Sequence, residues 1–180
     1  QNFDAYHTMI PHVKNADGSW SFDYAVFDEY VAFGKRCGIG PQIHCYTLAP
    51  WGNRVFYTDG ATGDQAAVTV RPGTPEHEAY WGPFLTDFQR HLVKTGWADD
   101  TYIAMDERGP EDTKATADCV KKFAPRLKIA MPGNHPPSHF KGIEIANYCQ
   151  FVAHIDAPFL AEAQARREQM LIGVAFFRHI

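Results

Sequence analysis

Two carboxylates stand side by side where a buried strand is expected to end. Asp106 and Glu107 follow the apolar run TYIAM in the stretch TYIAMDERGPED, residues 101–112. Paired carboxylates are suited to general acid–base catalysis. The structural alternative is a helix-capping acid beside a surface acid. Active sites of α/β folds gather at the carboxyl ends of parallel strands, so the position of the pair favours the catalytic interpretation.

A second group of candidate residues lies in QIHCYTLAPW, residues 42–51. Side chains alternate between the two faces of a strand, which puts Gln42, His44 and Tyr46 on one face and the intervening residues on the other. If the first face is the interior of a barrel, His44 and Tyr46 rise toward the same mouth as the acidic pair. The alternative is a histidine and a tyrosine with satisfied hydrogen bonds in the core.

A third group follows the next apolar runs. Asn134 and His135 lie in the Gly/Pro loop MPGNHPPSH, and His154 ends the run FVAHI. These histidines, with His44 and Asp106, raise the hypothesis of a metal site, but no HExxH or HxH spacing supports it. We therefore expect no metal and no cofactor. Ser/His/Asp catalysis is weaker still, because the chain has no G-x-S-x-G elbow.

The elements that must position these residues alternate between helix and strand. Strands are expected near 42–48, 101–105, 127–131, 148–154 and 170–176. A helix is expected after Trp20, with Ser21 as N-cap and an apolar stripe of Phe22, Val26, Tyr30 and Phe33. A second is expected over 74–96, with Thr74 as N-cap, Pro75 at its first position and Gly96 at its end, and others over 109–124 and from 157 onward. Residues 52–73 predict a β-hairpin inserted between a strand and a helix. Alternation of this kind is typical of parallel βαβ units, and we interpret residues 1–180 as one domain.

About five or six βα units fit in this chain of 180 residues. A complete (β/α)8 barrel needs eight strands and typically about 250 residues, so the pattern predicts an incomplete TIM-type barrel. An open, doubly wound sheet is the competing architecture, although its usual phosphate-binding glycine loop is absent from the sequence.

Composition excludes several classes of function. The net charge is −4 with no basic run, which argues against nucleic acid as a partner. No apolar run approaches the roughly 20 residues of a membrane span. The start QNFDAYHTMIPH lacks the features of a signal peptide. The four cysteines are widely spaced, and buried free thiols are expected rather than disulfides.

Several ordered segments resemble the catalytic barrel of glycoside hydrolase family 123. They are FDEYVAFGKRCGI, HCYTLAPWGNRVFYTD, EAYWGPFLTDFQRHLVKTGW and TYIAMDER, and the similarity runs from about residue 9 to about residue 155. The family comprises bacterial N-acetyl-β-galactosaminidases, whose longer chains carry a β-sandwich ahead of the barrel. The resemblance implies a (β/α)8 barrel that hydrolyses terminal β-linked N-acetylgalactosamine with retention. It also implies further barrel strands, from a longer parent chain or a second copy, and a secreted or periplasmic location.

The resemblance implies that the substrate's own acetamido group is the nucleophile. Such substrate-assisted enzymes need their carboxyls on one side of the sugar, which suits adjacent acids. Glu107 is then the proton donor and Asp106 the group that holds the acetamido N–H. Tyr46 is expected to bond the acetamido carbonyl, and Trp51, Tyr57 or Trp81 to stack on the sugar, with core packing as the alternative for Trp81. The further expected substrate contacts are His44, Asn134, His135 and His154.

Two other functions stay open at this point. One is a carbohydrate-binding module or inactive barrel fragment that has lost walls of its site. The other is a metal-dependent hydrolase.

Overall fold

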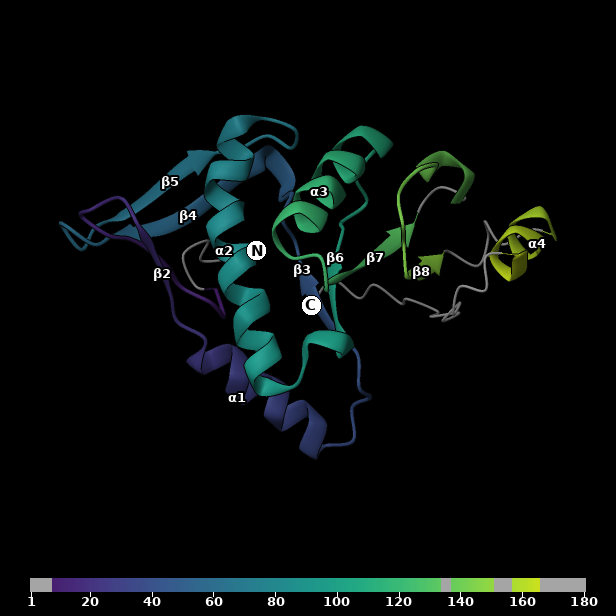
Figure 1. Ribbon diagram of the computed structural model, residues 1–180, viewed down its shortest axis with the longest axis horizontal. Helices are drawn as coiled ribbons and strands as arrows, with labels where there is room; N and C mark the ends of the chain where they lie inside the picture. The colour runs from purple at the N-terminus through teal and green to yellow at the C-terminus, as the bar shows by residue number, and fades with distance from the viewer. Residues whose placement is uncertain (1–7, 134–136, 151–156, 166–180) are drawn as a thin grey trace.

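A parallel sheet of four strands forms the centre of the chain in this computed structural model, which describes residues 8–133, 137–150 and 157–165 (Figure 1). Its strands are β3 (Ile43–Tyr46), β6 (Thr101–Ala104), β7 (Lys128–Gly133) and β8 (Asn147–Gln150), and they lie side by side in that order. Every neighbouring pair is parallel. The βαβ organisation predicted from the sequence is therefore confirmed for these strands.

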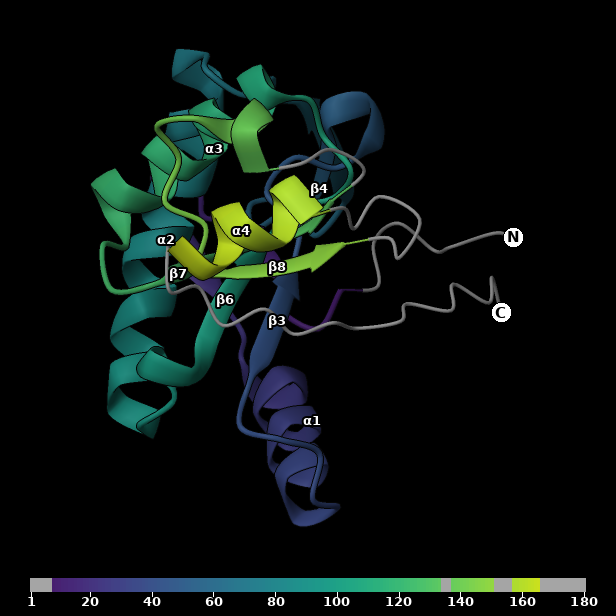
Figure 2. The same ribbon diagram turned by 90° about the vertical axis from the view of Figure 1, so that its right-hand side faces the viewer.

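Helices α2 (Pro75–Thr95) and α3 (Pro110–Phe123) lie on one side of this sheet (Figure 2). Helix α2 begins as predicted, because Thr74 Oγ1 accepts a hydrogen bond from His77 N at 3.3 Å and Pro75 occupies the first turn. It ends at Gly96, whose φ of 78° is a left-handed conformation that glycine adopts without strain. The two helices touch closely, since a Cβ on Gly82 would lie 2.9 Å from the ring of Phe123.

The two faces of the parallel sheet differ in chemistry. The face toward the helices carries Ile103, Met105, Ile129 and Met131, which belong to the main hydrophobic core with Phe88, Leu85 and Leu92 of α2. On the other face, the buried apolar cluster formed by the described residues is small and is made of Tyr102, Ala104 and Ala130. The first face supplies the packing, and the second presents polar side chains and small residues.

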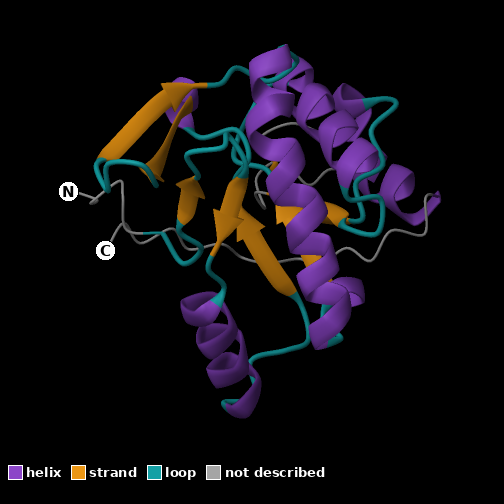
Figure 3. Cartoon of the chain, turned by 60° about the vertical axis from the view of Figure 1, so that its left-hand side comes forward, coloured by secondary structure: helices purple, strands orange, loops and turns teal. Residues whose placement is uncertain are grey.

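A second sheet flanks the first and is mixed in direction (Figure 3). Its strands, in the order β2-β1-β4-β5, are β1 (His12–Lys14), β2 (Trp20–Phe22), β4 (Arg54–Asp59) and β5 (Gln65–Thr69). Strands β4 and β5 are antiparallel and form the hairpin expected within 52–73. The hairpin is joined to the N-terminal strands, because β1 pairs with β4.

Helix α1 (Ala25–Arg36) differs from its prediction in two ways. Ser21 is not its N-cap, because Ser21 lies in β2 and pairs with Val13. The helix starts after Asp23, whose carboxylate accepts a hydrogen bond from Ala25 N at 2.9 Å. Its buried residues are Phe27 and Val31, whereas the apolar stripe chosen from the sequence is exposed at Val26, Tyr30 and Phe33.

The remaining described elements are short. They are the 3-10 turns η1 (Trp51–Asn53), η2 (Ala98–Asp100) and η3 (Pro137–Phe140), and helix α4 (Ala157–Ala165). The strand expected near 170–176 lies outside the described residues. The described part of the chain is a mixed α/β fold, and within it no helix has the length and apolar character needed to cross a membrane.

Candidate active site

Asp106 and Glu107 lie on the turn that follows β6. Strand pairing continues to Met105, whose N–H donates to Ala130 O at 2.8 Å, and Met105 is fully buried. The chain then leaves the sheet at its carboxyl edge, where both acids are half-buried. Glu107 N donates to Asp106 Oδ1 at 3.0 Å. The carboxylate of Asp106 therefore caps the turn that carries Glu107, and the catalytic role of Asp106 stays a prediction.

The carboxyl of Glu107 is available to a ligand. Within the described part of the chain it makes neither a hydrogen bond nor an ion pair with another residue. An acid meant to protonate a leaving group needs such an accessible carboxyl.

Tyr46 stands next to the acid pair at the end of the neighbouring strand. It pairs in register with Ala104, two residues before Asp106. Its side chain is 60% exposed, yet the pKa of its hydroxyl is raised, first by partial desolvation and then by Cys149 and by the charge of Asp106. The structure therefore brings Tyr46 within electrostatic range of Asp106.

His44 lies further from the carboxyl edge, on the same face of β3. Its ring stacks on Tyr102 with centroids 5.1 Å apart, and its Nε2 is 3.2 Å from Gln42 Oε1. Burial lowers the pKa of His44, which favours the neutral ring. These contacts hold the ring in place and favour a residue that lines the site over one that transfers protons. The contact of His44 with substrate stays a prediction.

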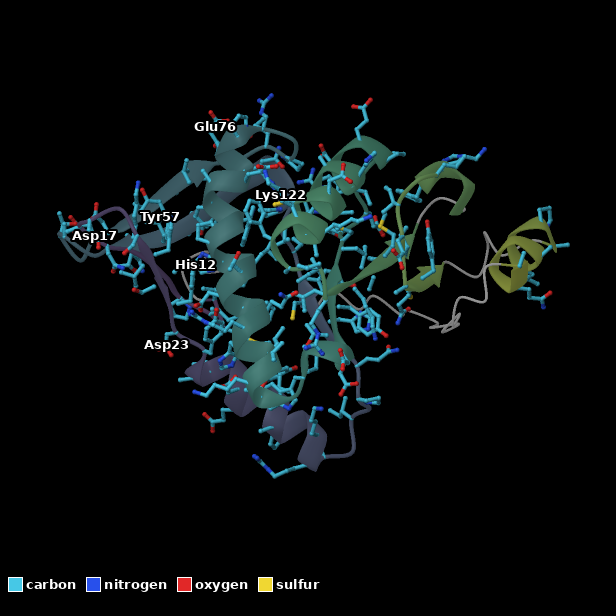
Figure 4. The ribbon with its side chains drawn as sticks, in the orientation of Figure 1. His12, Asp17, Asp23, Tyr57, Glu76 and Lys122 are labelled. Carbon is cyan, nitrogen blue, oxygen red and sulfur yellow. The ribbon has the colours of Figure 1, made fainter. Side chains whose placement is uncertain are left out.

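The aromatic residues expected to stack on sugar are placed differently from one another. Trp51 is 65% exposed, and its ring lies against the guanidinium of Arg108, 4.5 Å from Cζ to centroid. Tyr57 packs edge-on against Trp20 at 5.3 Å, on the hairpin side of α2 (Figure 4). Trp81 is buried in the main core. Of these three, Trp51 is the one that the described contacts link to the acid pair.

Three expected contacts cannot be placed. Asn134, His135 and His154 lie outside the described residues. Elsewhere in the described ranges, no cluster of three His, Cys, Asp or Glu side chains has the geometry to hold a metal ion.

Two residues near the acids were missed in the sequence. Arg108 directly follows the pair and lies with its side chain almost buried, at 10% exposure, between the acid turn and the segment 49–53. Cys149 of β8 influences the Tyr46 hydroxyl. In a sequence, an arginine after two acids is typical of a surface residue, and a cysteine in a strand is typical of the core. Neither pattern therefore indicated a residue of the site. Cys37, Cys45 and Cys119 are free thiols as expected, although Cys37 is exposed.

The arrangement combines three chemical functions at one edge of the sheet. Glu107 offers a carboxyl for proton transfer, Asp106 and Tyr46 offer polar atoms beside it, and Trp51 offers an exposed apolar face. Proton donors next to an aromatic platform are a combination that suits a carbohydrate, which presents hydroxyls at its rim and an apolar ring face.

Comparison with known proteins gives a consistent family. The family model described as the catalytic domain of glycoside hydrolase 123 matches residues 1–175. Among solved structures, the chain is similar to a family 123 glycoside hydrolase from Clostridium perfringens, studied for the details of glycolipid glycan hydrolysis. The identity is 28% and the TM-score 0.81, over 93% of this chain and 32% of that protein. The chain thus spans about a third of the length of that relative. The curated proteins compared contain no match.

Proposed function

The chain belongs to glycoside hydrolase family 123, and on this premise we propose that it is a glycosidase that releases terminal β-linked N-acetylgalactosamine with retention of configuration. The proposed mechanism is substrate-assisted, with the acetamido carbonyl oxygen of the sugar as nucleophile.

In the first step, Glu107 donates its proton to the glycosidic oxygen while the acetamido oxygen attacks the anomeric carbon. The bond to the leaving group breaks, and an oxazolinium ion forms. Asp106 accepts a hydrogen bond from the acetamido N–H and stabilises the positive charge. In the second step, Glu107, now a carboxylate, takes a proton from water, which attacks the anomeric carbon and reopens the ring.

One observation carries this proposal: the two acids share a single turn, held by the bond from Glu107 N to Asp106 Oδ1. Retaining enzymes with a protein nucleophile place their carboxyls about 5–5.5 Å apart across the scissile bond, and inverting enzymes about 6.5–9.5 Å apart. Consecutive residues on one turn are poorly placed to flank a sugar in either way. Adjacent acids suit a reaction in which the substrate's own acetamido group attacks the anomeric carbon from the opposite face of the sugar.

Tyr46 and Trp51 are the substrate contacts best supported by position. Tyr46 is close enough to Asp106 for the carboxylate to raise its pKa, which suits a hydroxyl that bonds the acetamido carbonyl. Trp51 presents an exposed ring for the apolar face of a pyranose. The contacts of His44, Tyr57, Asn134, His135 and His154 with sugar stay predictions.

We also propose that further strands complete the sheet into a barrel, supplied by a longer chain or a second copy. Among the described strands, β3 lies at an edge of the parallel sheet, and an uncovered edge of such a sheet is unusual because it leaves N–H and C=O groups without partners. A cleft of about 590 Å³ lies beside this edge, between α1, β1 and β3, and is lined largely by apolar side chains such as Ile10, Phe27 and Val31. Neither acid lines it, whereas His44 and Tyr46 do, so we assign the apolar part of the cleft to a packed element and the part beside His44 and Tyr46 to the sugar.

The experiment that tests the function compares two aryl glycosides. We expect hydrolysis of nitrophenyl N-acetyl-β-galactosaminide and none of nitrophenyl β-galactoside, which lacks the 2-acetamido nucleophile. The first product observed by NMR is expected to be the β-anomer. Equal rates on both substrates would exclude substrate assistance. Calorimetric binding of N-acetylgalactosamine without turnover would favour the alternative of a carbohydrate-binding module or inactive fragment.

A further inference from the structure

The guanidinium of Arg108 is engaged on every side. Its Nε donates to Ala49 O at 2.9 Å, and its Nη2 donates to Pro50 O and to Asn53 Oδ1, the latter at 3.2 Å. Its Nη1 lies 3.6 Å from a carboxylate oxygen of Asp112. Three of the five N–H donors of the guanidinium are used in these hydrogen bonds to the segment 49–53, and Nη1 faces Asp112, so we look for the role of Arg108 in what it holds.

What Arg108 holds is the segment that carries Trp51. This segment makes a tight turn, in which Gly52 and Asn53 both have left-handed backbone, with φ of 77° and 55°. Asn53 N donates to Pro50 O at 2.8 Å inside the turn, and Asn53 O accepts from Val70 N at the base of the hairpin. Arg108 binds the first carbonyls of the turn and the side chain of its last residue.

The backbone of Arg108 belongs to the acid turn. Its N–H donates to Asp106 O, and its carbonyl accepts from Thr113 Oγ1 at 3.3 Å in the first turn of α3. Arg108 is also covalently next to Glu107. The same residue is therefore fixed to the proton donor through its main chain and to the Trp51 turn through its side chain.

One face of the Trp51 ring rests on the guanidinium, while the ring as a whole stays 65% exposed. Contact with a cation on one face orders an indole and leaves its other face open to a ligand. Fixed placement of a platform relative to a proton donor is worth a large factor in rate, because small displacements from the reactive geometry are costly.

We propose that Arg108 is a positioning residue, which fixes Trp51 as a platform for a pyranose ring at a set place relative to the carboxyl of Glu107. This inference rests on the proposed function for its consequence in catalysis, but the placement of Trp51 by Arg108 is a property of the protein itself. Lysine cannot replace arginine here, because one ammonium cannot bond three acceptors in a plane and stack on an indole.

The kinetic test uses Arg108→Gln and Arg108→Lys in the full chain, with an aryl N-acetyl-β-galactosaminide. Both variants are expected to lower kcat/KM on the order of 10²-fold, with a raised KM as well as a lowered kcat. A mere loss of folded protein would lower the apparent kcat and leave KM unchanged. Arg126→Gln is the matched control, because Arg126 pairs with Asp99 at the surface; it is expected to keep both constants.

A milder variant protects the test against misfolding. Asn53→Gly removes one acceptor of the guanidinium and places glycine at a left-handed φ, which glycine adopts readily. It is expected to change KM and kcat in the same direction as Arg108→Gln, by a smaller factor. Combining Arg108→Gln with Trp51→Ala is expected to cost little more than Trp51→Ala alone, because both act through one platform. Full additivity of the two losses would contradict the inference.

A fluorescence measurement needs no activity. The emission of Trp51 is obtained as the difference between the wild-type protein and Trp51→Phe. In Arg108→Gln this emission is expected to be quenched more strongly by acrylamide and to lose anisotropy, and in Arg126→Gln to be unchanged. Wild-type protein that hydrolyses no glycoside would defeat the proposed function, and the quenching would still decide the placement. Unchanged quenching in Arg108→Gln would overturn the inference, whether or not the enzyme is active.

Discussion

Asn147 Nδ2 donates a hydrogen bond to Gln42 Oε1 at 2.9 Å, which joins β8 to the residue just before β3, across 105 residues of sequence and between the two outermost strands of the described parallel sheet. In a flat sheet these strands would lie about 14 Å apart, since neighbouring strands are spaced by about 4.8 Å. The register links Asn147 through Ala130 and Ala104 to Tyr46, not to Gln42. The described sheet is therefore curled toward this face rather than flat.

The bond across the sheet is expected to contribute measurably to stability. Gln42→Ala leaves the amide of Asn147, which is only 4% exposed, without this partner, and should lower the free energy of unfolding by about 1–2 kcal/mol. Urea unfolding of Asn147→Ala, Gln42→Ala and the double variant gives the coupling. Asn15→Ala is the control, since its bonds to Ser19 and Ser21 are exposed and should matter by less than about 0.5 kcal/mol. Independent effects of the two substitutions would mean that the bond is not formed in solution.

Substitutions of the two acids are expected to lower activity in different ways. Glu107→Gln removes the proton donor, so hydrolysis of a natural glycan should fall by about 10²–10⁴-fold, while an aryl glycoside with a good leaving group should lose less. Asp106→Asn weakens stabilisation of the oxazolinium charge, and its loss should be similar for both substrates. Measuring kcat/KM for each variant on each substrate decides the roles. The reverse pattern would exchange them, and no effect from either would leave the pair as a strand-end cap.

His12 is expected to make the fold sensitive to acid. It is 8% exposed among Phe22, Tyr80 and Phe84, and burial lowers its pKa from 6.5 to about 4. Between these two pKa values His12 is protonated in the unfolded chain and neutral in the folded chain. The free energy of unfolding therefore falls as the pH falls from about 6.5 toward 4. The loss approaches about 3 kcal/mol. When urea unfolding is measured across this pH range, the free energy of unfolding of His12→Phe should change with pH clearly less than that of the wild-type protein. An unchanged pH dependence would show that His12 is protonated without penalty.

Chelation separates the glycosidase from a metal-dependent hydrolase. No step of the proposed mechanism uses a metal, so activity on the aryl N-acetyl-β-galactosaminide should survive exhaustive dialysis against EDTA. Full activity after dialysis supports the carboxylate mechanism. Loss of activity that is restored by adding back a divalent cation would favour the metal-dependent alternative.

The sequence was informative where structure depends on neighbouring residues. Thr74, Pro75 and Gly96 define the ends of α2 by local chemistry, and all three were predicted. The start of α1 was wrong because Ser21 pairs with Val13 in a strand, a contact that helical spacing does not reveal. The prediction of its buried face was wrong because α1 carries two apolar stripes. Periodicity alone cannot decide whether Phe27 and Val31 or Tyr30 and Phe33 are buried.

The candidate site was predictable in part for the same reason. The position of Asp106 and Glu107 at a strand end could be predicted because the end of the apolar run is visible in the sequence. The face of Tyr46 could be predicted because side chains alternate along a strand. Arg108 was missed because its partners, Ala49, Pro50 and Asn53, lie more than 50 residues away. A buried arginine is recognised only when the fold has brought its acceptors together.

The unequal faces of the parallel sheet have a consequence for evolution. Ile103, Met105, Ile129 and Met131 pack under the helices, where a change of volume is felt at once. Tyr102, Ala104 and Ala130 lie on the opposite face, where they form a small buried cluster of their own and do not take part in that packing. Substitutions at exposed positions of this second face, such as Tyr46, can therefore accumulate with less loss of stability than substitutions in the packed face, so that related chains can differ around the acid pair while the packed face stays under purifying selection.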